Sequence, residues 1–342
     1  MSTTASRPIR IAQVGVGYWG QNLLRNFAAL PDAEVVLACD HSADVLARAE
    51  AAHPGLKTTT RFEDLVESNE VEAIVVATET PRHFLMAEAA LRAGKHVFVE
   101  KPMAQTVQQA ERLVTLAEDN DLRLMVGHLL LYHPAFRYVE SLIHSGALGD
   151  VQYLYSTRVN LGIVRQRENA FESLAPHDLA LALAFIDGAP VAVAAQGQAI
   201  LQPGVEDVVF ATVYFENNRI AHLHTSWLDP HKVRKVTVVG SKKMAVVDDV
   251  EAAEKVRIYD KGADAVEPGY TGYAEAITVR SGDITIPKIP SVEPLRAECT
   301  HFIDCVRTGE RPRTDGWNGL AVVRLLEAAK RSLADGGARV EL

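Results

Sequence analysis

The feature that most constrains this chain is a glycine-rich turn, Gly15-Val16-Gly17-Tyr18-Trp19-Gly20, which lies between an apolar run and a segment with helical spacing. The apolar run predicts a buried strand, and the segment after the turn predicts a helix. In such a unit Gly15 permits the tight turn, Gly17 lets the backbone approach a pyrophosphate, and Gly20 lets the helix pack on the strand. The helix N-terminus offers N–H groups to phosphate oxygens. The motif predicts a dinucleotide site; a glycine turn without a ligand is the alternative.

An aspartate supports this interpretation and bears on the choice of dinucleotide. Asp40 follows the apolar run 34–39, about 20 residues beyond the end of the turn, where a carboxylate accepts both hydroxyls of the adenine ribose. It would repel a 2′-phosphate, and the next residues are His41 and Ser42 rather than arginine. The sequence therefore favours NAD over NADP. The alternative role, capping the next helix, suits Ser42 better.

The first third of the chain alternates strand and helix patterns. Strands covered by helices on both faces read as uninterrupted apolar runs, which is the pattern found here. It predicts an α/β Rossmann domain over residues 1–127, with a doubly wound, mostly parallel sheet. The expected strands are residues 9–14, 34–39, 73–77, 96–99 and 123–126, and the expected helices are residues 19–30, 42 onward, 62–67, 81–93 and 106–120.

After residue 127 the pattern changes to that of an antiparallel sheet. Residues 219–227 alternate, with Ile220, His222, His224 and Ser226 on one face. This predicts an α+β domain over residues 128–342, whose large antiparallel sheet has one open face. Residues 261–273 are expected to form a loop. The expected strands are residues 151–159, 191–200, 208–215, 219–227, 235–239, 244–247 and 256–259, and the expected helices are residues 134–145, 176–186, 293–307 and 319–333, the last two packing back toward the domain interface.

Bulk properties exclude several classes of function. A net charge of −9 argues against a nucleic-acid-binding face. The first residues lack a signal segment, and no run reaches the roughly 18 apolar residues of a membrane helix. The three cysteines are dispersed, which fits a reducing, cytoplasmic setting. His222 and His224 have metal-compatible spacing, but no third ligand is evident, so no metal is expected.

A tripeptide at the carboxyl end of a predicted strand points to chemistry. Glu100-Lys101-Pro102 follows residues 96–99, at the edge where ligands bind in open α/β sheets. Lysine there can reach both the nicotinamide ribose and a substrate hydroxyl, whereas a surface turn is the alternative. Together with the glycine turn, Asp40 and the two-domain order, the tripeptide resembles the Gfo/Idh/MocA oxidoreductases, the glucose–fructose oxidoreductase and inositol dehydrogenase family. Thr80-Pro81-x-His83 and Pro134 are further matches, and the resemblance covers nearly the whole chain.

The resemblance implies roles for individual residues. The family's catalytic lysine corresponds to Lys101, and its loop that contacts the cofactor corresponds to residues 78–83. The family histidine that begins a helix in the second domain corresponds to His177, with Ser173 in place of the usual aspartate; capping of the helix is the alternative role. The implied catalytic residues are Lys101 and His177, and the implied cofactor-binding residues are Gly15, Gly17, Tyr18, Trp19, Gly20, Asp40, Thr78, Thr80, His83, Glu100, Lys101 and Pro102.

The implied reaction is hydride transfer from a sugar carbon to the nicotinamide, while a side chain removes the hydroxyl proton. His177 suits a base near neutral pH. Lys101 can stabilise the developing alkoxide or accept the proton itself, and the sequence leaves both roles open.

Within the family, the chain resembles the 3-dehydrogenases of UDP-N-acetylglucosamine or its uronic acid, which make a 3-keto sugar for later amination. A nucleotide diphosphate needs cations. The expected substrate-binding residues are Lys101, Asn160, Arg165, Arg167 and His177, with Arg158, Lys232, Arg234 and Lys235 as further cations around the sheet.

Three alternatives remain: another sugar or polyol dehydrogenase of the family, a sugar 3-ketoreductase, and an NAD-binding sensor without turnover. Family members form dimers or tetramers, so a homo-oligomer through the open sheet face is expected. Trp227 is expected to stack on uracil or to join that contact, and Trp317 to pack at the domain interface.

Overall fold

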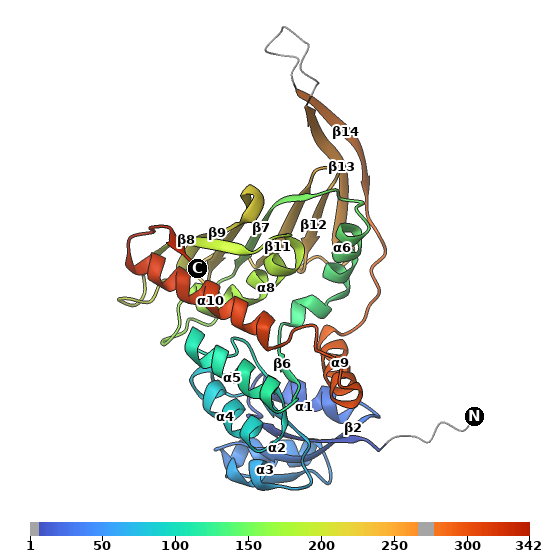
Figure 1. The fold of residues 1–342 in the computed structure, drawn as a ribbon, viewed down its shortest axis with the longest axis vertical. Coiled ribbons are helices and arrows are strands. Elements are labelled where there is room, and N and C mark those ends of the chain that lie inside the picture. Colours follow the sequence, from blue (N-terminus) through green and yellow to red (C-terminus); the bar gives the residue numbers. More distant parts are fainter. Residues whose placement is uncertain (1–6, 266–276) are drawn as a thin grey trace, which may run out of the picture. The chain divides into compact units, whose positions relative to one another are not determined.

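The computed structural model describes residues 7–265 and 277–342 and divides into two compact units (Figure 1). Unit 1 contains the chain up to Tyr132 together with Val292–Arg324. Unit 2 contains His133–Ser291 and Leu325–Leu342. The sequence predicted one boundary at residue 127. The structure differs chiefly in that the segment Val292–Arg324 packs with the N-terminal half.

Six parallel strands form the sheet of unit 1, in the order β3-β2-β1-β4-β5-β6. The residues of β4 are fully buried, as expected for a parallel strand covered on both faces. The strand order reverses at β1, and ligands bind beyond the carboxyl ends of the strands at such a reversal. The strands are β1 (Ile9–Val14), β2 (Ala33–Cys39), β3 (Lys57–Thr59), β4 (Ala73–Val76), β5 (His96–Val99) and β6 (Leu124–Val126).

Helices cover both faces of this sheet. Val97 and Val99 of β5 join a core with α4, α5 and the start of α10. Phe98 points to the other face, where its ring contacts Phe27 of α1 and Phe302 of α9 edge to face. This aromatic cluster explains why α9 belongs to unit 1. The helices are α1 (Gly20–Ala28), α2 (Ala43–Ala52), α3 (Glu63–Glu67), α4 (Thr80–Arg92), α5 (Val107–Asp119), η1 (Leu129–Tyr132), α9 (Pro294–Thr308) and α10 (Gly316–Ala334).

Unit 2 is built on a nine-stranded sheet in the order β14-β13-β12-β11-β7-β10-β9-β8-β15. Strands β7 and β10 pair in parallel, and their other neighbours are antiparallel. The predicted fold class, a doubly wound parallel sheet followed by a largely antiparallel sheet, is thus confirmed. The strands are β7 (Val151–Val159), β8 (Pro190–Gln198), β9 (Val208–Phe215), β10 (Arg219–Ser226), β11 (Val233–Gly240), β12 (Met244–Asp248), β13 (Val256–Ala265), β14 (Ile277–Thr285) and β15 (Val340–Glu341).

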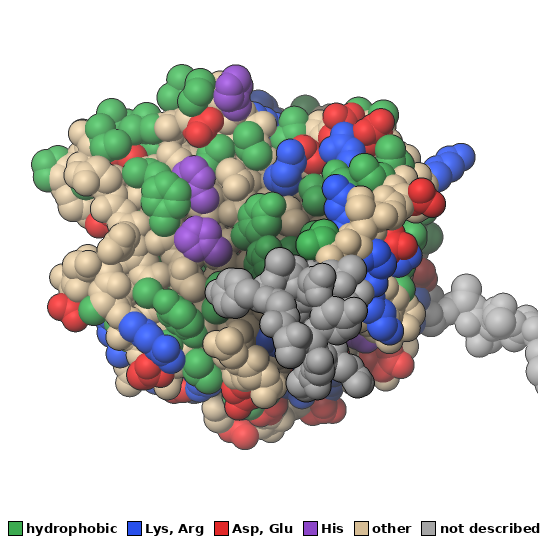
Figure 2. All heavy atoms as spheres, turned by 90° about the horizontal axis from the view of Figure 1, so that it is seen from above, with side chains coloured by type: hydrophobic (Ala, Val, Ile, Leu, Met, Phe, Trp, Pro, Cys, Tyr) green, Lys and Arg blue, Asp and Glu red, His purple; other side chains and the backbone are tan. Residues whose placement is uncertain are grey.

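One face of this sheet is covered and the other is open. Helices α6 (Pro134–His144), α7 (Ala170–Leu174), α8 (Pro176–Phe185) and the end of α10 pack on the covered face. The open face carries exposed aromatic and aliphatic side chains, and Figure 2 shows hydrophobic and histidine side chains side by side on the molecule seen from the end that bears β13 and β14. These exposed residues include Tyr153, Tyr155, Phe210, Ile220 and His222.

The predicted loop over residues 261–273 is wrong in part. Residues 261–265 continue β13, which pairs with β14, and residues 266–273 lie outside the described part of the chain. The hydrophobic pattern of the sequence does not predict this hairpin, because its described residues are mostly exposed and apolar residues do not alternate along it. The predicted face of β10 holds, because the strand keeps an uninterrupted register from Ile220 to Ser226; on that face Ser226 alone of the four is buried.

Candidate functional site

The glycine turn has the geometry that a dinucleotide requires. A Cβ on Gly15 would lie 2.5 Å from the carbonyl oxygen of Ala77, and one on Gly20 would lie 2.1 Å from the carbonyl oxygen of Gly15. These two glycines are therefore fixed by packing. A Cβ on Gly17, in contrast, would meet no protein atom within 4 Å. Open space above Gly17 fits the expectation that a pyrophosphate approaches the backbone there.

Two side chains, those of Gln13 and Asp40, bind the backbone of this turn. Gln13, which sequence reasoning missed, is buried and donates from Nε2 to the carbonyl oxygens of Gly15 (2.9 Å) and Gly20 (2.7 Å). Asp40 accepts from the backbone N–H of Val16 (3.0 Å) and of Ser42 (3.0 Å). Ser42 rather than Asp40 caps α2. Asp40 thus lies against the turn at the end of β2, where a ribose diol would be bound.

A buried carboxylate links the glycine turn to the predicted catalytic tripeptide. The indole Nε1 of Trp19 donates to Oε1 of Glu100 (2.6 Å), and the backbone N–H of Lys101 donates to Oε2 (3.2 Å). A Cβ on Gly127 would lie 3.1 Å from the carboxyl carbon of Glu100. Glycine at the end of β6 therefore leaves room for this carboxylate. Burial raises the pKa of Glu100, and the bond from Trp19 opposes that rise. Tyr18 beside it is largely exposed.

His83 is a buried side chain that connects the tripeptide Glu100-Lys101-Pro102 with the loop that begins at Thr78. It is buried, and its ring nitrogens lie 2.8 Å from the carbonyl oxygen of Pro102 and 3.0 Å from that of Thr78. Burial lowers the pKa of His83, so the neutral ring donates to one of these carbonyls at a time. His83 thus braces the loop that the resemblance assigned to cofactor contact. Thr78 is half-buried on that loop, and Thr80 is the first residue of α4.

Two further buried ionisable groups lie near the tripeptide, and sequence reasoning missed both. Neither ring nitrogen of His128 and neither carboxyl oxygen of Glu298 has a hydrogen-bond partner among the residues that the structure describes. Burial and the charge of Lys101 lower the pKa of His128 to about 3. Burial, and then the charge of Glu100, raise the pKa of Glu298 well above its usual value. His128 follows Gly127 directly after β6; that place was the one available signal. The sequence around Glu298 gives no such signal, because a glutamate is common inside a helix.

Unit 2 holds the other predicted catalytic residue. His177 is the second residue of α8 and is half-buried. Its neighbour Asp178 is buried and accepts from Nε (2.7 Å) and Nη2 (2.9 Å) of Arg158 on β7. Arg158 was expected among the substrate cations, but this paired geometry commits it to Asp178. The pair fixes the start of α8, and therefore the backbone of His177, to the sheet.

Three of the five predicted substrate residues lie on the segment that follows β7: Asn160, Arg165 and Arg167. The backbone N–H of Asn160 donates to the carbonyl oxygen of Ser226 (3.1 Å), which places it beside the end of β10. Arg165 and Arg167 are exposed, and Arg165 lies 3.6 Å from Glu168. The segment ends at Asn169, which caps α7 in a capping box with Glu172.

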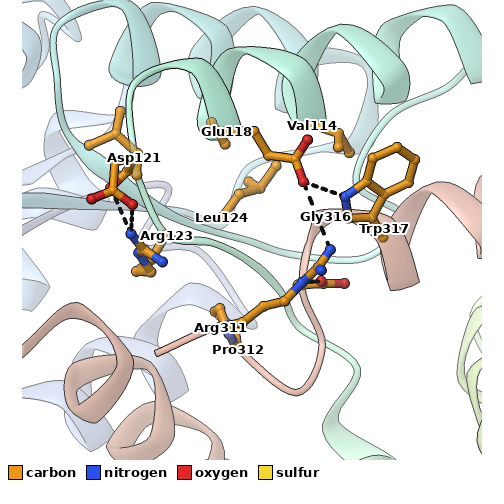
Figure 3. Close-up of a pocket in the computed structure, with 12 residues that line it drawn as sticks. Val114, Glu118, Asp121, Arg123, Leu124, Arg311, Pro312, Gly316 and Trp317 are labelled. Carbon is orange, nitrogen blue, oxygen red and sulfur yellow. Dashed lines mark hydrogen bonds and ion pairs between the residues drawn. The ribbon is translucent and has the colours of Figure 1, made fainter. Parts of the chain in front are cut away.

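Two tryptophans donate hydrogen bonds inside their own units. Trp227 is buried and its indole donates to Oδ1 of Asp207 (2.6 Å), so it neither stacks on a ligand nor meets a partner. Trp317 donates to Glu118 (2.6 Å) within unit 1 and lines a cavity of about 230 Å³ (Figure 3). Leu124 at the amino end of β6 also lines that cavity. Because Gly127 and Glu100 lie at the carboxyl end, the cavity is separate from the candidate cofactor site.

Across residues 7–265 and 277–342, no cluster of three or more histidine, cysteine, aspartate or glutamate residues has a geometry suited to a metal ion. In the same part of the chain, no helix combines the length and the apolar character that crossing a membrane requires.

Comparison with known proteins agrees with the two-unit architecture. Residues 9–128 match the model of the GFO/IDH/MocA oxidoreductase family, with an NAD-binding Rossmann fold, and residues 136–246 match the GFO/IDH/MocA C-terminal domain. The UDP-N-acetylglucosamine 3-dehydrogenase of Acidithiobacillus ferrooxidans is 28% identical over 316 residues, covering 92% of this chain and 94% of that protein. A solved structure of that enzyme has a TM-score of 0.80 at 23% identity, covering 97% of this chain and 100% of that one. The inositol 2-dehydrogenase of Rhizobium meliloti is 24% identical over 346 residues, covering 96% and 97%.

The bond between Trp19 and Glu100 is expected to stabilise unit 1. Trp19→Phe removes the donor to a buried carboxylate, so the free energy of unfolding should fall by about 1.5–3 kcal/mol. Trp317→Phe is the matched control, because its indole donates over the same 2.6 Å to Glu118, whose side chain is 57% exposed. The control should lose less than about 1 kcal/mol. Urea unfolding followed by circular dichroism measures both, and equal losses would contradict the account.

The buried carboxyl of Glu298 should make stability depend on pH. Because its pKa is raised from 4.5 in the folded protein, the unfolded chain releases this proton first as the pH rises. The group's contribution is then lost at up to about 1.4 kcal/mol per pH unit until the folded group ionises as well.

Glu298→Met removes this titration and keeps the volume similar. The variant should therefore gain stability over the unchanged protein as the pH rises from 5 to 8, as measured by urea unfolding at each pH. A difference that stays constant over this range would show that Glu298 is not held protonated.

Proposed function

The chain belongs to the GFO/IDH/MocA family of NAD(P)-dependent oxidoreductases, and on this premise we propose that it oxidises the C3 hydroxyl of a UDP-linked amino sugar with NAD. The observation that carries the proposal is the link from the glycine turn through Trp19 and Glu100 to Lys101. It ties the residue proposed for chemistry to the turn proposed for the pyrophosphate.

NAD fits the residues present. Gly17 leaves space for the pyrophosphate, and Asp40 presents a carboxylate for the ribose hydroxyls that would repel a 2′-phosphate. Tyr18, Trp19, Thr78 and Thr80 would border the dinucleotide. Bound NAD supplies the acceptor for a hydride from the sugar carbon. Gln13 and His83 are buried and hold the turn and the loop in place through bonds to backbone carbonyls.

The remaining chemistry belongs to side chains of this chain. When the C–H bond at C3 breaks and its electron pair leaves as hydride, the hydroxyl proton must leave as well, and a carbonyl forms. His177 accepts that proton, since a histidine works as a base near neutral pH. Lys101 binds the same hydroxyl oxygen and stabilises its developing negative charge. The pair Arg158–Asp178 keeps the start of α8, and with it His177, in position.

The choice of a UDP-linked amino sugar rests on likeness and charge together. The 3-dehydrogenase relative acts on UDP-N-acetylglucosamine by its name and aligns over most of this chain. Arg165 and Arg167 are exposed on the segment that precedes α7, so their guanidinium groups are accessible to a diphosphate. Asn160 on the same segment would read a sugar hydroxyl. The aligned inositol 2-dehydrogenase makes a free polyol the second candidate.

A second copy of this chain is the proposed partner of the open sheet face. Tyr153, Tyr155, Phe210 and Ile220 are each 37–46% exposed on adjacent strands β7, β10 and β9. A contiguous apolar patch of this kind marks an interaction site. It supports a homodimer or homotetramer.

The oligomer proposal has a direct test. Tyr155→Lys should shift the protein toward the monomer in sedimentation velocity, because a charge would be buried in the contact. Lys330→Met changes an exposed, ion-paired lysine on α10, whose end packs on the covered face, and serves as a comparison for general effects on unit 2. A monomeric unchanged protein would contradict the proposal.

The proposed activity is tested by NADH formation, followed at 340 nm. Purified protein and NAD would be offered UDP-N-acetylglucosamine, its uronic acid, myo-inositol and glucose, with an aminotransferase present to draw the 3-keto product forward. We expect turnover with a UDP sugar alone. Turnover of a free polyol alone would overturn the substrate proposal, and no turnover at all would favour a sensor.

The roles of the two catalytic residues are tested in the same assay. Lys101→Met and His177→Asn should each lower kcat about 10²- to 10⁴-fold, the range for a lost acid–base group, while calorimetry shows unchanged NAD affinity. Loss of NAD binding without a separate loss of chemistry would contradict these assignments.

A further inference from the structure

One end of the β7–β11 pair carries charge on the covered face of the sheet in unit 2. On β7 and β11, Leu154 lies opposite Val238, and Ser156 lies opposite Val236. One step further along the same face, Arg158 lies directly opposite Arg234. Two arginines thus meet as a cross-strand pair, an arrangement that is destabilising unless counter-charges are present.

Counter-charge is present for the first arginine and incomplete for the second. Arg158 is buried and makes two short bonds to Asp178. Arg234 lies 3.9 Å from Asp249, beyond hydrogen-bond distance, and 41% of its side chain is exposed. Asp249 is shared, because His133 lies 3.4 Å and Lys255 lies 3.9 Å from its other oxygen. Burial and the charge of Arg158 lower the pKa of Arg234, and Asp249 and Asp178 oppose that fall only in part.

The cluster therefore carries excess positive charge. Arg158, Arg234 and Lys255 are three cations, and Asp178 and Asp249 are two carboxylates. Burial lowers the pKa of His133, so its ring is neutral at pH 7 and adds no charge. One positive charge is left without a counter-charge in a half-buried setting. A ligand oxyanion would supply it, and a guanidinium can bind such an anion with two parallel bonds.

The cluster lies beside the proposed catalytic histidine. Asp178, which binds Arg158, follows His177 directly in α8, and Arg234 is one strand away from Arg158. Neighbouring strands lie roughly 5 Å apart, so an anion on Arg234 lies within the reach of one sugar nucleotide from His177.

We propose that Arg234 binds an oxyanion of the substrate, either the carboxylate of a uronic acid or a diphosphate oxygen. This rests on the proposed function, because it deepens the substrate class assigned to that site. It makes Arg234 a specificity-determining residue, while Arg158 on the opposite strand is a positioning residue.

The experiment compares Arg234→Met with Lys235→Met. Lys235 is the next residue on β11. It was expected among the cations around the sheet, but its side chain points to the open face, away from Arg158 and Arg234, and lies 3.2 Å from Asp248. Its exposed fraction is 42%. The two changes thus remove one cation of equal exposure from opposite faces. KM and kcat would be measured with NAD and with UDP-N-acetylglucosamine or its uronic acid. Arg234→Met should raise KM about 10- to 100-fold with a smaller effect on kcat, and Lys235→Met should leave both unchanged.

The pattern of KM distinguishes the two anions. A rise for the uronic acid alone assigns the carboxylate, and an equal rise for both substrates assigns the diphosphate. Arg234→Lys should recover part of the affinity, since it keeps the charge and loses the planar fork. An unchanged KM for both substrates, or the same rise in Lys235→Met, would overturn the proposal.

Failure of the proposed function would look different. In that case the unchanged protein would oxidise neither UDP sugar. Binding of UDP and of glucuronate to the NAD-loaded protein would then be measured by calorimetry. Tighter binding of either anion to the unchanged protein than to Arg234→Met supports the oxyanion site, and equal or absent binding overturns it.

Discussion

A buried carboxylate at the carboxyl end of β5 determines how the cofactor unit of this protein is arranged. Glu100 needs donors because water does not reach it, and the donors come from two separate segments, the indole of Trp19 and the backbone of Lys101. Gly127 lacks a side chain where the carboxylate lies. Satisfying one buried charge thus brings the glycine turn, the lysine tripeptide and the end of β6 to a single point.

Unit 2 solves a similar problem with an ion pair. Arg158 and Asp178 are both buried, and each satisfies the other through two bonds. Such a pair adds less to stability than to definition of a geometry, because desolvation offsets much of the attraction. Here it fixes α8 at the residue after His177. Both proposed catalytic residues, Lys101 and His177, are therefore sequence neighbours of a buried carboxylate that anchors the backbone.

The sequence predicted what depends on local pattern. The positions of the glycine turn and Asp40 and five of the six strands of unit 1 follow from spacing and apolar runs, and the structure agrees with them. Strand β3 (Lys57–Thr59) was not predicted, because its residues form no apolar run. The sequence did not predict the roles of Gln13, His128 and Glu298, because those roles depend on which atoms surround each side chain after folding. Arg158 and Trp227 look like surface or ligand-binding residues in sequence, yet Asp178 and Asp207 bind them inside the fold. The hairpin of β13 and β14 was not predicted, because its residues are mostly exposed and show no alternation of apolar and polar side chains.

The central claim is that unit 1 is a dinucleotide site selective for NAD, and titration calorimetry of the purified protein with NAD and with NADP tests it most directly. The account predicts saturable NAD binding and affinity for NADP weaker by at least tenfold, because Asp40 would oppose the 2′-phosphate. In the variant Asp40→Ala this preference should shrink as NAD binding weakens. Equal or tighter binding of NADP by the unchanged protein would contradict the account.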